Sequence, residues 1–206
     1  MKSAAEAASD ADVVVFLDGD GQHDPGDISK IIAPILQNKA DLVIGSRCLP
    51  ESKVSVSPFT RRFTNNVASF IISMIISFLL PLASQLNRLT HPTKQTQLAQ
   101  QTQPTQQTPL TANCQLPTGK LNWITDCTSG FRAIKKESWQ KLELTSKGFQ
   151  IETEMIYEAA RKGLTIAEVP ISCNWNSEFS RLSIIQDGLR TLNLLSKKLL
   201  TNLRKG

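Results

Sequence analysis

The chain has 206 residues, of which 40% are hydrophobic and 20% are charged. These proportions are typical of a globular domain with a sizeable core, and they exclude an intrinsically disordered chain. The formal net charge of +5 is modest and gives no reason to expect a nucleic-acid partner. Four scattered cysteines without a CxxC pair argue against a zinc site, and we expect a reducing, cytoplasmic setting.

The first part of the chain shows a pattern of strand, helix and strand. "VVVFL" (13–17) predicts a buried strand, and "ADLVIGSR" predicts a second strand at about 41–45. Between them, Asp27 is expected to be the N-cap of a helix that runs to about Gln37 with a kink at Pro34. This βαβ spacing predicts an α/β sheet.

Polar side chains follow both predicted strands. Asp18 and Asp20 come after the first strand, and Ser46 and Arg47 come after the second. Ligands of α/β sheets bind at the carboxyl ends of the strands, so these four residues are candidates for a binding site.

Residues 48–62 have the composition of a loop and are followed by the uncharged segment "VASFIISMIISFLLPLA" (67–83). Its 17 residues stand at the lower limit for crossing a bilayer, and Pro81 and several serines weaken that interpretation. An interfacial or half-buried helix is preferred, a core helix comes next, and a spanning helix comes last.

The composition changes abruptly at Gln85. As far as about Lys120 the chain consists largely of Gln, Thr and Pro, with few apolar residues. Such a tract cannot build a core, so we expect a disordered insertion at about 85–120 between two parts of one domain.

A globular composition returns at "WITDCTSGFRAIKKESW" (123–139). Beyond it we predict a helix over about 152–162 and a strand, "TIAEVPI", over 165–171. From Arg181 onward six basic residues accompany one acid, which suits an anionic surface such as a membrane face about as well as a solvated helix face. This last segment predicts an amphipathic helix whose apolar residues are expected to pack on the core: Ile185, Leu189, Leu192, Leu195, Leu199 and Leu203.

The segment "DGDGQHDP" raises the question of a metal site. Carboxylates at the end of a buried strand are costly to desolvate unless a cation pairs with them. Once the chain turns through its glycines, Asp18 and Asp20 can converge on one ion, and Gln22 offers an amide oxygen as a third ligand. Such hard oxygen ligands suit Mg²⁺ or Mn²⁺, which would then bridge the phosphates of a nucleotide.

Three other interpretations of this motif compete. A calcium loop of the EF-hand type requires Gly at its sixth position and Glu at its twelfth, where this chain has His23 and Ser29. A phosphatase of the haloacid dehalogenase type also has D-x-D after an apolar strand, but it needs a later acidic pair that "DLVIGSR" and "TIAEVPI" do not supply. The third interpretation is a polar turn that binds no ligand, and this motif alone does not exclude it.

Four motifs occur in this order: "FLDGDGQHDP", "ADLVIGSR", "TDCTSGFRAI" and "FQIETEMIYEAARKGLTIAEVPI". Together they resemble the GT-A glycosyltransferases of family 2, and most of all the polyprenyl-phosphate sugar transferases, the dolichol-phosphate mannose synthase group. The resemblance implies a single α/β domain over 1–206, with a Rossmann-like mixed sheet flanked by helices and the insertion at about 85–120. The family's first strand, of the "VVIPAYNE" kind, is not found here, so we expect a domain that is incomplete at its N-terminus.

The resemblance also implies a function. Enzymes of this group transfer a sugar from a nucleotide-diphosphate-sugar donor to a polyprenyl phosphate acceptor, with inversion, and such a protein would be peripheral on the cytoplasmic face of the membrane. The alternative is a non-catalytic, truncated homologue that binds a membrane or a partner. An Mg²⁺-dependent phosphatase is a distant third.

On the donor side, the resemblance assigns Asp18, Asp20 and Gln22 as ligands of Mg²⁺ or Mn²⁺, with Asp20 beside the donor phosphates. Arg181 lies in "FSRL", which is similar to an element of the family that contacts phosphate. His23 could approach the donor, although a role in the turn is preferred.

On the acceptor side, Arg47 and Arg132 match residues that would hold the acceptor phosphate, and Asp126 and Arg132 match the segment that lines the reaction centre. A phosphate monoester is already largely a dianion at neutral pH, so no strong base is needed. Asp126 is therefore expected to orient the acceptor, the metal or a basic neighbour. Glu152 and Glu154 begin a helix whose dipole favours acids, and this structural role is preferred to a catalytic one.

Overall fold

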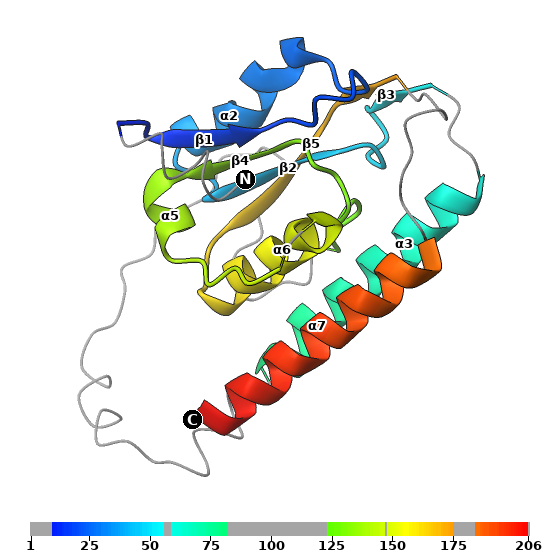
Figure 1. Cartoon of the computed structure of the whole chain (residues 1–206). Coiled ribbons are helices and arrows are strands. Elements are labelled where there is room, and N and C mark those ends of the chain that lie inside the picture. Colours follow the sequence, from blue (N-terminus) through cyan, green and yellow to red (C-terminus); the bar gives the residue numbers. More distant parts are fainter. Residues whose placement is uncertain (1–9, 56–58, 82–122, 147, 175–183, 206) are drawn as a thin grey trace.

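Figure 1 shows the computed structural model of the chain, which describes residues 10–55, 59–81, 123–146, 148–174 and 184–205. The predicted insertion and Arg181 lie outside these residues.

The core is a four-stranded mixed sheet with the order β1-β4-β2-β5. Strand β4 is antiparallel to both β1 and β2, whereas β5 is parallel to β2. The predicted class, an α/β domain with a mixed sheet and flanking helices, is confirmed, and the strands expected from the sequence are β1, β2 and β5. The four strands are β1 (Val13–Phe16), β2 (Leu42–Ser46), β4 (Arg132–Lys135) and β5 (Ile166–Pro170).

Strand β4, which the sequence analysis did not predict, lies between β1 and β2. It begins with Arg132, whose side chain is completely buried. Because β4 runs opposite to its two neighbours, β1 and β2 are parallel to each other, and their carboxyl ends lie at the edge where β4 begins. The segments after β1, after β2, before β4 and after β5 therefore all meet at one edge of the sheet.

Helices cover both faces of this sheet (Figure 1). Helix α2 (Ile28–Leu36) packs on one face, and α6 (Ile151–Arg161), preceded by the short turn η4 (Gly148–Gln150), covers the other. The helix predicted over 152–162 is thus confirmed as α6. The short helix α5 (Lys136–Gln140) follows β4 and brings Trp139 against Phe16, with ring centroids 5.1 Å apart.

The beginning of α2 differs from the prediction. Asp27 occupies the N-cap position, but its side chain makes no capping hydrogen bond. It accepts hydrogen bonds from Lys30 Nζ and from the backbone N–H of Ser172, both at 2.5 Å. The side-chain cap belongs to Asp24, which accepts from Gly26 N at 2.8 Å in the turn η1 (Pro25–Asp27). Asp27 thereby ties α2 to a small second sheet, in which β6 (Ser172–Cys173) runs parallel to β3 (Lys53–Val54).

The apolar segment predicted at 67–83 belongs to a longer helix. It consists of α3 (Phe59–Met74) and the π-helical segment η2 (Ile75–Leu79). This helix begins within the segment 48–62, so the prediction of a loop there was wrong from Phe59 onward. Its half-buried character is confirmed, because Ile72 is fully buried while Phe70 and Phe78 are 54% and 55% exposed. Among the described residues, no helix is long and apolar enough to cross a membrane.

The predicted C-terminal helix is α7 (Ile184–Lys205), which lies beside α3 (Figure 1). Leu195 is buried, as expected from the apolar stripe, whereas Leu192 is 40% exposed and does not join the core. Lys198 fixes α7 to α6 by ion pairs with Glu154 at 2.8 Å and Glu158 at 2.6 Å. Both carboxylates are almost completely buried, so α7 is held to the core by charge as well as by apolar packing.

Candidate active site

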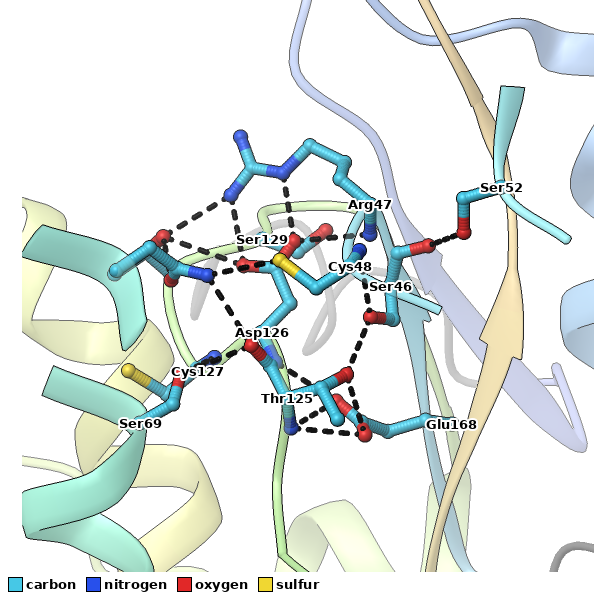
Figure 2. Close-up of polar contacts among 12 residues, drawn as sticks. Ser46, Arg47, Cys48, Ser52, Ser69, Thr125, Asp126, Cys127, Ser129 and Glu168 are labelled. Atoms are coloured by element: carbon cyan, nitrogen blue, oxygen red, sulfur yellow. Dashed lines mark hydrogen bonds and ion pairs between the residues drawn. The ribbon is translucent and has the colours of Figure 1, made fainter. Parts of the chain in front are cut away.

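Arg47 and Asp126 form a bidentate ion pair at the edge of the sheet where the four segments meet. Arg47 Nε donates to Asp126 Oδ2 at 2.7 Å, and Arg47 Nη2 donates to Oδ1 at 2.8 Å. The backbone N–H of Arg47 also donates to Oδ2, at 3.0 Å. Figure 2 shows the guanidinium of Arg47 facing the carboxylate of Asp126. The structure thus brings together two residues that are 79 positions apart in the sequence.

Electrostatics keep both members of this pair charged. Burial alone would raise the pKa of Asp126, but the charge and hydrogen bonds of Arg47 hold this pKa below its usual value. Burial would likewise lower the pKa of Arg47, and Asp126 raises it instead. The Asp126 side chain is fully buried, whereas 19% of the Arg47 side chain is exposed. Asp126 is therefore already engaged with a basic neighbour, and Arg47 is the member of the pair that reaches solvent.

Helix α3 holds the loop that carries Asp126. Ser69 Oγ donates to the carbonyl of Thr125 at 3.2 Å and accepts from the backbone N–H of Cys127 at 3.0 Å. The Asn65 amide donates to the same carbonyl of Thr125 and accepts from the Thr128 hydroxyl at 2.8 Å. The Thr128 hydroxyl in turn accepts from Arg47 Nη2 at 3.0 Å. The buried polar face of the apolar helix is therefore a scaffold for this loop.

Glu168 is a further residue of the site, and the sequence analysis did not identify it. Its carboxylate accepts hydrogen bonds from the backbone N–H groups of Thr125 and Asp126 at 2.9–3.0 Å and from the Thr125 hydroxyl at 2.9 Å. The Thr125 hydroxyl also lies 2.7 Å from Ser46 Oγ at the end of β2. Burial raises the pKa of Glu168, although these hydrogen bonds oppose the shift. A carboxylate within the otherwise apolar strand "IAEVP" was the available signal.

The D-x-D turn follows β1 at the same edge. Asp18 and Asp20 are exposed, whereas Gln22 is buried. The Asp18 carboxylate lies directly against Gly130, where a Cβ atom would be only 2.6 Å from Asp18 Cγ. Asp20 Oδ1 accepts from the backbone N–H of Gln22 at 3.0 Å, and this bond closes the turn.

The two exposed carboxylates of this turn are hard oxygen donors of the kind that Mg²⁺ prefers. In the part of the chain that the structure describes, neither Asp18 nor Asp20 forms an ion pair, and no group of three His, Cys, Asp or Glu side chains could hold a metal ion. Mg²⁺ is commonly bound by one or two carboxylates, and water and phosphate oxygens complete its coordination shell.

His23 links the turn to the rest of the site. Its ring lies 5.5 Å from that of Phe131, and its backbone forms a β-bridge with Cys173. Burial, and then the charge of Arg47, lower the pKa of His23, against the opposite effect of the carboxylates of Asp18 and Asp20. The D-x-D turn and Arg47 therefore both lie within electrostatic range of the His23 ring.

Arg132 lies under the loop rather than in solvent. Its guanidinium donates to the carbonyls of Ser129 and Cys127, each at 2.7 Å, and to the carbonyl of Glu152. The side chain is fully buried, and a direct contact of Arg132 with the acceptor phosphate stays a prediction. Glu154 has the structural role that was preferred for it, since it binds residues 145 and 146 and Lys198.

The chain is similar in sequence to several sugar transferases. The chain is 27% identical over 173 residues to the UDP-N-acetylglucosamine--dolichyl-phosphate N-acetylglucosaminyltransferase of Methanococcus voltae, a match that covers 83% of this chain and 51% of the relative. It is 26% identical over 164 residues to the undecaprenyl-phosphate mannosyltransferase of Micrococcus luteus, a match that covers 78% of this chain and 49% of the relative. It is 28% identical over 161 residues to the dolichol-phosphate mannosyltransferase of Pyrococcus furiosus, a match that covers 78% of this chain and 33% of the relative.

The chain thus spans about half the length of the first two of these relatives. Residues 2–142, more than half of the chain, match the family described as "Glycosyl transferase family 2". That stretch contains the D-x-D turn, Arg47, Asp126 and Arg132. The chain belongs to glycosyltransferase family 2.

Proposed function

We propose that this chain transfers a sugar, with inversion, from a nucleotide-diphosphate-sugar to a polyprenyl phosphate. The observation that carries the proposal is the position of the Arg47–Asp126 pair at the same sheet edge as the D-x-D turn. A site for a cation-bound diphosphate and a guanidinium for the acceptor phosphate then lie on neighbouring loops. The names of the relatives, which are transferases acting on dolichyl or undecaprenyl phosphate, support the same substrate classes.

Arg47 would bind the acceptor phosphate. Its guanidinium is held on one side by Asp126 and Thr128, and the side chain is partly exposed, so it can offer further N–H donors to a phosphate oxygen. The acceptor is largely a dianion at neutral pH, and it can attack the anomeric carbon without first losing a proton. Asp126 therefore has a positioning role, because it fixes the direction of Arg47.

Asp18 and Asp20, with Gln22, would hold Mg²⁺ or Mn²⁺ together with the donor diphosphate. When bound, the ion would supply a Lewis acid that stabilises negative charge on the departing nucleoside diphosphate. Asp20 would lie beside these phosphates, and Arg181, which lies outside the described residues, would be a further phosphate contact. Arg132 would serve the reaction centre by holding the loop at Cys127 and Ser129, because its described hydrogen bonds run to backbone carbonyls.

A membrane surface would present the acceptor, and the protein would lie on its cytoplasmic face. The exposed side of α3 and η2 is strongly apolar, while the opposite side carries the polar residues that hold the Asp126 loop. Trp123 stacks on Phe70 with ring centroids 5.1 Å apart and extends this surface. The exposed apolar side chains of this surface are Val67, Phe70, Met74, Phe78, Leu79 and Trp123.

The test is a transfer assay on the 206-residue chain. The protein would be incubated with Mn²⁺, a short polyprenyl phosphate in detergent, and labelled UDP-N-acetylglucosamine or GDP-mannose. We expect a labelled polyprenyl-phosphate sugar with inverted anomeric configuration, and we expect it to disappear with a chelator or with Asp20→Ala. Label transfer that survives both treatments, or no transfer from either donor, would refute the proposal. Loss of activity in Arg47→Ala with unchanged donor binding would separate the acceptor role from the donor role.

A further inference from the structure

Three buried polar atoms beside the candidate site lack a hydrogen-bond partner among the described residues: His23 Nδ1, Glu152 Oε2 and Ser129 Oγ. Glu152 and Ser129 are 8% and 0% exposed. Buried polar atoms are nearly always paired, so the unpaired carboxylate oxygen of Glu152 and the unpaired hydroxyl of Ser129 need an explanation. An unpaired buried acceptor destabilises the fold, and a bound ligand could supply the missing partner.

Arg132 binds the backbone of both residues. Its Nε donates to the carbonyl of Ser129 at 2.7 Å, and its Nη1 donates to the carbonyl of Glu152. Gly130, the residue after Ser129, is the one against which the Asp18 carboxylate lies. Ser129 and Glu152 are therefore grouped around one guanidinium at the side of the D-x-D turn.

Electrostatics agree with this placement. Burial raises the pKa of Glu152, Arg132 opposes that shift, and the negative charge of Asp18 adds to it. Asp18 thus lies within electrostatic range of Glu152.

The chemistry of this cluster favours a neutral ligand with hydroxyl groups. A phosphate here would be repelled by the carboxylates of Asp18 and Glu152, and the described hydrogen bonds of Arg132 run to backbone carbonyls. A sugar hydroxyl could donate to Glu152 Oε2 and accept from Ser129 Oγ. The sugar is also the part of the donor that is attached directly to the diphosphate, and the diphosphate is assigned to the adjacent turn.

We propose that Glu152 and Ser129 bind a hydroxyl group of the donor sugar and so help to determine which sugar the protein accepts. The proposal rests on the proposed function, because it places the diphosphate of the same donor at Asp18 and Asp20. A site built to hydrogen-bond a hydroxyl rejects analogues that lack it or place it differently, since its buried groups are then left unpaired.

The test compares binding of nucleotide-sugars with binding of the nucleotide alone. Isothermal titration of the 206-residue chain with Mn²⁺ would use UDP-N-acetylglucosamine and GDP-mannose, each beside UDP or GDP. In Glu152→Gln we expect the affinity for the preferred nucleotide-sugar to fall about tenfold, because a hydrogen bond to a charged acceptor is lost. The affinity for the nucleoside diphosphate should change by less than about twofold, which is a small fraction of the energy of one hydrogen bond. Ser129→Ala should show a smaller but equally selective loss of affinity for the nucleotide-sugar. The matched control is Glu137→Gln, on the exposed surface of α5.

The possible outcomes separate the two proposals. Equal affinity of wild-type and Glu152→Gln for the nucleotide-sugar, or an equal loss for nucleotide-sugar and nucleotide, would overturn the sugar site and leave the proposed function standing. If the wild-type chain bound none of the four probes, or if Asp20→Asn bound them all as well as wild-type, the proposed function itself would fail. A melting curve by circular dichroism identifies a variant that does not fold, and Ser129→Ala then carries the test in place of Glu152→Gln.

Discussion

The guanidinium of Arg47 and the carboxylate of Asp126 form two parallel hydrogen bonds of 2.7 and 2.8 Å across two loops at the edge of the sheet. One partner is fully buried and the other is partly exposed. This geometry allows Asp126 to set the direction of a cationic group that faces outward, and it explains why the "GSR" and "TDCTSGFR" segments belong to one site.

Asp126→Asn should uncouple these loops. The amide cannot accept from both Nε and Nη2 of Arg47, and the guanidinium loses its buried counter-charge. We expect a loss of about 3 kcal/mol in the free energy of unfolding, measured by urea denaturation. Glu51→Gln, an exposed position, should change it by less than about 0.5 kcal/mol. A stability of Asp126→Asn equal to that of wild-type would show that the pair does not hold the loops together.

Gly130→Ala should disturb the metal-binding turn without unfolding the domain. A Cβ atom at this position would overlap the carboxylate of Asp18, so the carboxylate must move. We expect at least a tenfold loss of Mn²⁺ affinity in the presence of UDP or GDP, since one of two charged ligands is displaced. Glu137→Gln, on the exposed surface of α5 and outside the turn, is the control. Equal Mn²⁺ affinity of the two variants would contradict the role of Asp18.

The acid stability of the fold should depend on Glu154. Burial would raise the pKa of Glu154, but the Lys198 ammonium and the hydrogen bonds of Ser146 and Thr145 lower it from 4.5 to about 2. A lowered carboxyl pKa contributes stability that is fully present above pH 4.5 and is lost as the pH falls through about 2. Glu154→Gln should therefore be less stable than wild-type at pH 6, and the difference should shrink as the pH approaches 2.

Chemical denaturation at a series of pH values measures this difference. A gap between wild-type and Glu154→Gln that stays constant over the whole range would contradict the assigned ion pair. Lys198→Met provides a second measurement, because it leaves the buried carboxylate of Glu154 without its cation, whereas Glu158 keeps its ion pair with Arg161. It should destabilise the chain by about 3 kcal/mol at pH 7.

The apolar surface of α3 and η2 should bind lipid. Replacing Phe70 and Phe78 by Ser removes two large exposed side chains, each worth about 1.5–3 kcal/mol if it is buried in the bilayer interface. We expect co-sedimentation with anionic vesicles to fall by roughly tenfold or more for the double variant. Leu36→Ser is the control, because Leu36 is 67% exposed but lies on α2, across the sheet. A similar loss in the control, or none in the double variant, would point away from this surface.

The sequence predicted those parts of the fold that have a strong local signal. The runs at 13–17, 41–45 and 165–171 are apolar and β-branched, and each forms a strand of the sheet. Strand β4 was not predicted because it contains a fully buried arginine, whose guanidinium donates to backbone carbonyls that the fold brings to it. No local pattern can supply that information.

The same distinction applies to the candidate site. The D-x-D turn, Arg47 and Asp126 were recognised from motifs, and the topology of the sheet explains why they converge. Glu168 and Ser69 were not recognised, since their roles consist of hydrogen bonds to backbone atoms of a loop that is distant in the sequence. The spacing of Asn65, Ser69 and Ser73 on one face of an apolar helix was the available signal, because each binds residues of that loop.

The most direct measurement is the titration of Mn²⁺ into the 206-residue chain with UDP or GDP present, followed by electron paramagnetic resonance. The variants are Asp18→Asn and Asp20→Asn, and Asp24→Asn is the matched control from the same segment. The account predicts that wild-type and Asp24→Asn bind the ion equally well, and that the other two variants lose at least about tenfold in affinity. Equal binding by all four proteins would contradict the claim that two carboxylates at this edge of the sheet hold the cation.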